Sequence, residues 1–188
     1  MQLSIVGVSH KTAPVEIRER LAFPSDGVQS ALSSLVQRER IAEAMILSTC
    51  NRVEIVAEGP DDRPIRDFLC EYHRIPAAAV SSHLYSYRNT DAIRHVFRVT
   101  SSLDSMMIGE PQILGQVKEA FRIATNAGTI GMHLSALMTR AFAVAKKVNV
   151  LRLSCHPKVL VHNELPAARL RCGSRAQRRM GAALKTMV

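Results

Sequence analysis

The sequence predicts an α+β domain: a ferredoxin-like sheet of the split βαβ type, then a helical part, then a basic tail. Over residues 1–88, strand-like runs and helical spacings follow the order strand, helix, strand, strand, helix, strand. From 89 to 148 the apolar residues recur only at helical spacing. We therefore expect one domain at 1–148, with an α+β part (1–88) and a helical part (89–148), and a divergent tail at 149–188.

The first three elements follow from short local patterns. The β-branched run "QLSIVGVS" at 2–9 is typical of a buried strand. Pro14 suits the first turn of a helix and Glu16 favours its positive end, so a short helix is expected within 13–23. A second helix, with an inward face, is predicted to reach about residue 40 (Ala31, Leu35, Val36).

The second half of the sheet is predicted in the same way. "AEAMILS" at 42–48 is an apolar strand, and residues 53–58 alternate as a strand does, with Val53, Ile55 and Ala57 on one face. After a Pro/Asp-rich turn at 60–64, helical spacing appears (Ile65, Phe68, Leu69, Tyr72). "SHLYSY" at 82–87 is expected to be the last strand.

Three helices are predicted for residues 89–148 from three apolar faces. The second begins behind Pro111 and ends near Gly128. The faces are Ile93, Val96, Phe97, Thr100 and Leu103; Ile113, Val117, Ala120, Phe121 and Ala124; and Leu134, Leu137, Met138, Ala141 and Ala145.

Composition limits the class of protein. The chain has 188 residues, of which 47% are hydrophobic, enough for a core. There is neither a signal-peptide pattern nor an apolar run long enough to span a membrane, so we expect a cytoplasmic protein. The four cysteines lie 20, 85 and 17 positions apart, without the spacing of a zinc site, so no metal is expected (Cys50, Cys70, Cys155, Cys172).

The positive charge is concentrated in the tail. Residues 149–188 hold six Arg, two Lys and one Glu, a net +7, out of +9 for the whole chain. Helical periodicity weakens after 148, where Pro157 and Pro166 interrupt the sequence. A basic tail and a split βαβ order would also suit an RNA-binding module, although aromatic residues make up only 4% of the chain.

Cys50, in "LSTCNRVEI" (47–55), has two interpretations. The first interpretation is that Cys50 packs in the core, because free cysteines are among the most buried residues. However, Cys50 comes shortly after the last apolar residue of a predicted strand, and Asn51 is typical of a turn. The positive charge of Arg52 would lower the pKa of the Cys50 thiol and could bind an anion. The second interpretation is that Cys50 is a nucleophile.

Ordered motifs resemble those of the glutamyl-tRNA reductase family. Besides "LSTCNRVEI", the similar stretches are "GVSHKTAPVEIRERLAF" (7–23), "IRHVFRVTSSLDSMMIGEPQILGQVKEAF" (93–121) and "HLSALMTRAFAVAKKV" (133–148), so the resemblance covers about residues 1–148. It implies that the thiolate of Cys50 takes the glutamyl group from glutamyl-tRNA(Glu) as a thioester. NADPH then reduces this thioester to glutamate-1-semialdehyde, at the start of tetrapyrrole biosynthesis.

The resemblance also implies the site residues. Cys50 would be the nucleophile, and His95, which its spacing places off the predicted core stripe, would assist proton transfer to the leaving ribose oxygen. The remaining positions would bind substrate: Thr49, Asn51, Arg52, Ser105, Glu110, Pro111, Gln112 and Gln116. Gln112 and Gln116 share one helical face, for which the plain alternative is an exposed polar surface.

The resemblance ends near residue 148. The family continues with a spine helix, a Rossmann domain for NADPH and a helical dimerisation domain, whereas here "NVLRLSCHPKVLVH" follows and no GxGxxG occurs. We hypothesise a shifted reading frame after 148 and expect a largely disordered tail. The implied partners are glutamyl-tRNA(Glu), the downstream aminomutase and a second copy. Without a domain for NADPH, we expect at most a glutamyl-tRNA esterase, or else an inactive truncated product.

Overall fold

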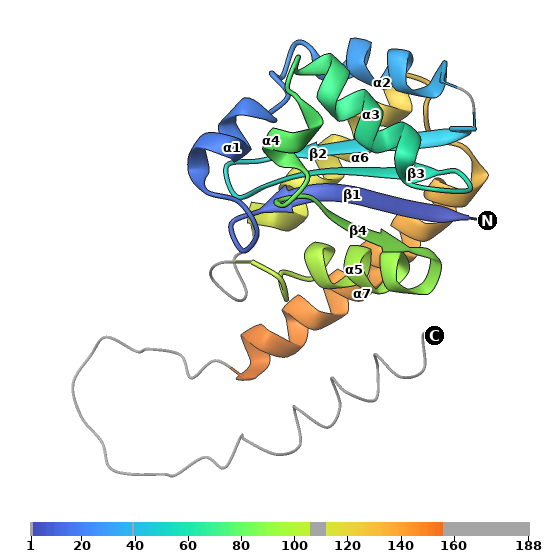
Figure 1. Ribbon diagram of the computed structural model, residues 1–188. Coiled ribbons are helices and arrows are strands. Elements are labelled where there is room, and N and C mark those ends of the chain that lie inside the picture. The colour runs from blue at the N-terminus through green and yellow to red at the C-terminus, as the bar shows by residue number, and fades with distance from the viewer. Residues whose placement is uncertain (1, 39, 106–111, 156–188) are drawn as a thin grey trace.

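A four-stranded antiparallel sheet lies at the centre of the fold (Figure 1). The computed structural model of the chain describes residues 2–38, 40–105 and 112–155. The strand order is β2-β3-β1-β4, and the neighbours pair antiparallel. This is the arrangement predicted for a split βαβ unit. The strands are β1 (Leu3–Ser9), β2 (Glu43–Ser48), β3 (Arg52–Glu58) and β4 (Tyr85–Arg88).

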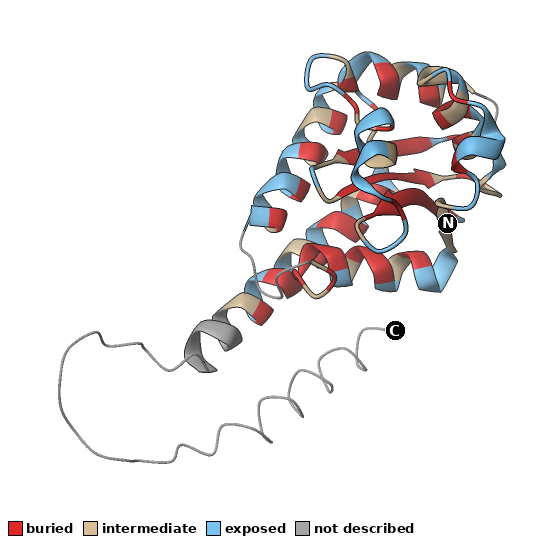
Figure 2. Ribbon diagram, turned by 60° about the vertical axis from the view of Figure 1, so that its left-hand side comes forward, coloured by how far each residue is buried: buried red, intermediate tan, exposed pale blue. Residues whose placement is uncertain are grey.

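Helices cover both faces of the sheet. Figure 1 shows α2 and α3 on one side of the strands and α5 and α7 on the other. All seven residues of β1 are consequently buried, as are all residues of β2 and β3 except the last of each, whereas the edge strand β4 is only partly buried (Figure 2). The helices are α1 (Val15–Arg20), α2 (Val28–Val36), α3 (Arg63–Tyr72), α4 (Ala77–Val80), α5 (Asn89–Thr100), α6 (Gln112–Asn126) and α7 (Met132–Cys155).

The close packing of β1 on β3 requires a glycine. A Cβ atom at Gly7 would lie 2.5 Å from the carbonyl oxygen of Val53 and 2.8 Å from Cγ of Glu54. Both distances are shorter than a carbon atom can approach without a shift of the neighbouring strand. Gly7 therefore leaves the space that the Glu54 side chain occupies beneath β1.

The predicted order of strands and helices is confirmed, with four differences. The short helix α4 was not predicted, α2 ends at Val36 rather than near residue 40, and the last strand begins at Tyr85 rather than at residue 82. Helix α7 passes the predicted boundary at 148 and extends to Cys155, the last described residue. The boundary itself stays a prediction, and residues 156–188 lie outside the described part.

The buried face of α5 differs from the predicted one. Ala92, His95, Val96 and Val99 are buried, whereas Ile93 is only partly buried. The helix is enclosed because it contacts β1, β4, α6 and α7. The prediction that His95 lies off the core stripe was therefore wrong: His95 is 7% exposed.

Candidate active site

Cys50 lies in a tight turn between β2 and β3. The backbone N–H of Thr49 donates to the carbonyl of Arg52 at 2.8 Å, and the Thr49 hydroxyl accepts from the backbone N–H groups of Asn51 and Arg52 at 3.3 and 3.1 Å. A threonine hydroxyl thus fixes the turn, as short polar side chains often do. Cys50 at its tip is exposed, so the interpretation as a core cysteine was wrong.

Two neighbouring segments hold this turn from outside. The guanidinium of Arg18 in α1 donates to the carbonyl oxygen of Cys50 at 2.7 Å. The backbone N–H of His10, just after β1, donates to the carbonyl of Asn51 at 2.9 Å. The backbone carbonyls of Cys50 and Asn51 are therefore both hydrogen-bonded, which holds the turn in place, while the thiol of Cys50 remains accessible. An accessible thiol in a fixed position is what a nucleophile needs.

A small polar cavity of about 40 Å³ opens beside the thiol, with room for only a few water molecules. Except for His95, every predicted site residue that the structure describes lines it. Ile113, predicted only as a core residue, lines it as well; Glu110 and Pro111 lie outside the described residues. The lining is Thr49, Cys50, Asn51, Arg52, Ser105, Gln112, Ile113 and Gln116.

Arg52 is buried and already paired. Its side chain is 2% exposed, Nη1 lies 2.7 Å from Oε1 of Glu54, and Nη2 lies 3.3 Å from Oδ2 of Asp104. Nη2 also donates to the backbone carbonyl of Asp104. Burial by itself would lower the pKa of Arg52, but the charge and hydrogen bond of Glu54, with the charges of Tyr85 and Asp104, together outweigh burial and raise this pKa. A substrate carboxylate would have to use the N–H groups that these two partners leave free.

Glu54 is the centre of a buried network. Its Oε1 atom accepts hydrogen bonds from Arg52, from the Tyr85 hydroxyl and from Nε2 of His95 at 2.8 Å. Burial would raise the pKa of Glu54, but the hydrogen bond and charge of His95 and the charge of Arg52 lower it below its ordinary value. Burial and the nearby Glu54 charge raise the pKa of Tyr85. Glu54 is thus an ionised carboxylate inside the domain.

His95 and Cys50 lie in different cavities. The ring of His95 stacks on Tyr87 with ring centroids 4.5 Å apart, and both line a cavity of about 490 Å³. Asp104 lines this second cavity and Arg52 lines the first, so the Arg52–Asp104 ion pair separates the two. The other residues around the larger cavity are Ser9, Lys11, Thr12, Tyr85, Asp91, Arg94 and Arg98.

The sequence reasoning missed Glu54, Tyr85 and Asp104 as site residues. One signal was available: Arg52 and Glu54 are spaced i, i+2 in a strand, which puts their side chains on the same face. An arginine and a glutamate side by side on one face of a strand can form an ion pair. Asp104 gives no such signal, since its contact with Arg52 joins positions 52 residues apart.

One group of described residues has the donor atoms to hold a metal ion. It consists of Glu43, Glu58 and His133, at the end of the β2–β3 hairpin opposite Cys50. Among the helices that the structure describes, none is long and apolar enough to cross a membrane.

The fold and the site define an α+β domain with a ferredoxin-like sheet that presents an exposed turn cysteine in a polar cavity. The family model described as "Glutamyl-tRNAGlu reductase, N-terminal domain" matches residues 6–150. The chain therefore belongs to the glutamyl-tRNA reductase family.

Individual relatives agree with this assignment. The chain is 49% identical to the "Glutamyl-tRNA reductase" of Methylococcus capsulatus, over 84% of this chain and 38% of that protein. It is 52% identical to the "Glutamyl-tRNA reductase 2" of Koribacter versatilis, over 79% of this chain and 34% of that protein. The structure of "Glutamyl-tRNA Reductase from Methanopyrus kandleri" is similar with a TM-score of 0.64 and 34% identity, over 79% of this chain and 34% of that one. The matched region is less than two fifths of each relative's length.

Proposed function

We propose that this domain transfers the glutamyl group of glutamyl-tRNA(Glu) to the thiolate of Cys50. This would be the first half of the reduction to glutamate-1-semialdehyde. The observation that carries the proposal is the exposed thiol at the tip of the β2–β3 turn, beside a cavity lined by polar side chains. A buried packing cysteine would require neither exposure nor such a lining.

The transfer is a nucleophilic substitution at the ester carbonyl. The Cys50 sulfur attacks the carbonyl carbon, the C–S bond forms, and the bond to the ribose oxygen breaks. That oxygen leaves with a proton from solvent, which frees the tRNA and leaves a thioester on the enzyme. The amide groups of Asn51, Gln112 and Gln116 would bind the substrate's polar atoms. Because both glutamines are exposed, their side chains can move to enlarge the small cavity.

Arg52 and His95 would serve this site in different ways. Arg52 would offer its remaining N–H groups to the glutamyl carboxylate. The proton-transfer role expected of His95 would require the substrate to reach the second cavity. Its hydrogen bond to Glu54, which in turn holds Arg52, supports a positioning role for His95.

The described residues do not fit a dinucleotide cofactor. NADPH binding of the Rossmann type needs parallel strands and a glycine-rich turn that opens a helix, whereas the described sheet is entirely antiparallel. We therefore place only the acyl transfer on this domain, and NADPH, the aminomutase and homodimerisation remain family-based proposals for the whole protein. In the absence of hydride transfer, water would attack the thioester, releasing glutamate and restoring the thiol.

The test is incubation of the purified chain with glutamyl-tRNA that carries labelled glutamate, without NADPH. After acid quenching, intact mass shows any adduct and scintillation counting shows released glutamate. We expect an adduct or glutamate release that Cys50→Ser abolishes and that Cys70→Ser leaves unchanged, because Cys70 packs against the core. Equal release by the wild type and Cys50→Ser, both folded, would refute the proposal.

A further inference from the structure

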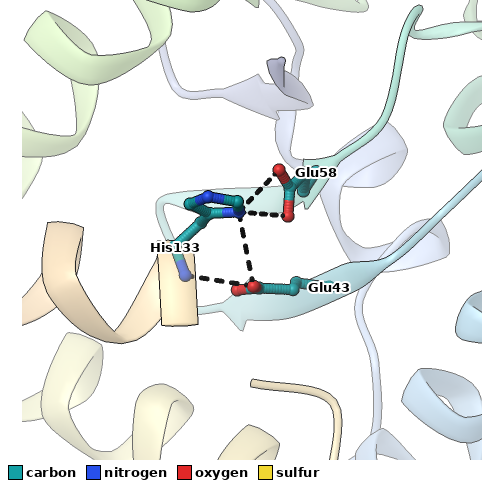
Figure 3. A group of neighbouring side chains, drawn as sticks. All are labelled: Glu43, Glu58 and His133. Atoms are coloured by element: carbon teal, nitrogen blue, oxygen red, sulfur yellow. Dashed lines mark hydrogen bonds and ion pairs between the residues drawn. The ribbon is translucent and has the colours of Figure 1, made fainter. Parts of the chain in front are cut away.

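Three side chains with metal-binding donor atoms meet at the open end of the β2–β3 hairpin (Figure 3). Glu43 begins β2, Glu58 ends β3, and the two are directly paired across the sheet. His133 is the second residue of α7. Its Nδ1 atom lies 2.7 and 2.8 Å from the two oxygens of Glu58 and 3.8 Å from Oε1 of Glu43. One donor atom from each residue lies within 4.8 Å of the other two.

The cluster has more negative than positive charge. Like charges directly opposite each other in a sheet are destabilising, and Glu43 is only 7% exposed. Within the described ranges, His133 is the one ion-pair partner of either carboxylate, and it contacts both through a single nitrogen. A neutral imidazole would leave two negative charges at this position. The surroundings therefore favour a cation.

The geometry of the cluster is fixed in advance. Glu43 accepts from the backbone N–H groups of His133 at 3.0 Å and Leu134 at 2.7 Å, so the first turn of α7 holds both carboxylate oxygens. A Cβ atom at Gly131 would lie 2.4 Å from Oε1 of Glu43, so a larger residue there would displace the carboxylate from this position. Hydrogen bonds of this kind orient the carboxylates that bind metals.

We propose that Glu43, Glu58 and His133 bind a divalent transition-metal cation, for which Zn²⁺ is the probe. One imidazole and two carboxylates are donors that zinc accepts, and water would complete the coordination because Glu58 and His133 are only partly buried. Binding would require Nδ1 without a proton, so the neutral ring would hold the ion through Nδ1 and keep its proton on Nε2. The ion would join the start of α7 to the hairpin at the end opposite Cys50. Its role would be structural and independent of the proposed acyl transfer.

The test is zinc binding to the full chain with Ser in place of all four cysteines, because thiolates bind zinc strongly. Isothermal titration gives the affinity and stoichiometry, and thermal unfolding gives the shift in Tm. We expect one zinc per chain and a higher Tm with zinc. Glu58→Gln and His133→Gln should each weaken binding at least about tenfold. Gln at position 133 keeps a donor for Glu58, and the melting curve without metal shows whether each variant folds.

Two matched variants serve as controls. Glu119→Gln and His83→Gln change an exposed glutamate and a histidine outside the cluster, and both should bind zinc as the parent does. His156 and His162 remain in every variant, so zinc held by the tail would survive all substitutions. Binding that Glu58→Gln and His133→Gln leave unchanged, or the absence of any zinc-dependent shift in Tm, would overturn the proposal.

Discussion

Replacing Glu54 by Gln should destabilise the domain strongly. The side chains of Glu54 and Arg52 are 3% and 2% exposed, and removing one member of a buried ion pair typically costs 3–5 kcal/mol. Arg52 keeps Asp104 as a partner, so we expect the lower end, about 3 kcal/mol. The free energy of unfolding falls by roughly 2 kcal/mol per molar urea, so the unfolding midpoint should fall by about 1.5 M urea.

The assay is urea unfolding followed by circular dichroism, with Glu119→Gln as the control. Glu119 forms an ion pair with Arg122 on the surface, so removing the Glu119 charge should hardly change the unfolding midpoint. The pH dependence is a second test. Because the folded pKa of Glu54 lies below its ordinary value of 4.5, its contribution is present above that value and lost as pH falls through the folded pKa. The difference in unfolding midpoint between the wild type and Glu54→Gln should therefore become smaller in acid. Equal midpoints at pH 7 would refute the reasoning.

Two further predictions concern a histidine and the buried arginine. Burial lowers the pKa of His73 from 6.5 to about 4, so its contribution to stability is present above pH 6.5 and lost as pH falls towards 4. NMR titration of the His73 ring in the folded domain should give a midpoint well below that of an exposed histidine, and an ordinary midpoint would contradict its burial. Arg52→Lys should reduce Cys50-dependent glutamate release, because one ammonium cannot replace the fork that contacts Glu54 and Asp104. Unchanged release would show that charge alone suffices.

Much of the fold could be predicted from local patterns. The strand and helix order followed from periodicity, and the position of Cys50 followed from the end of an apolar strand before Asn51. These features depend on neighbours a few residues apart, which the sequence displays directly. The hydroxyl of Thr49 that holds the turn belongs to the same kind of local interaction.

The buried network could not be predicted in the same way. Alternation in 53–58 suggested that Glu54 lies on a polar face, but α5 covers that face, and His95 reaches Glu54 across 41 positions. The same covering explains why His95 is buried although its spacing placed it off the predicted apolar stripe. Periodicity separates apolar from polar positions, but it cannot separate a solvated polar face from one that meets a second polar group in the interior.

Asp104 connects the two halves of the candidate site. Its carboxylate forms ion pairs with Lys11, Arg52 and Arg98. Burial alone would raise the pKa of Asp104, but the hydrogen bonds and charges of Lys11 and Arg52 together lower it. Ser105 follows directly and lines the Cys50 cavity. Because Arg52 holds both the side chain and the backbone carbonyl of Asp104, it fixes the segment after α5 against the turn that carries the thiol. The burial of Arg52 is therefore compatible with a site role, since it keeps two walls of one cavity in register.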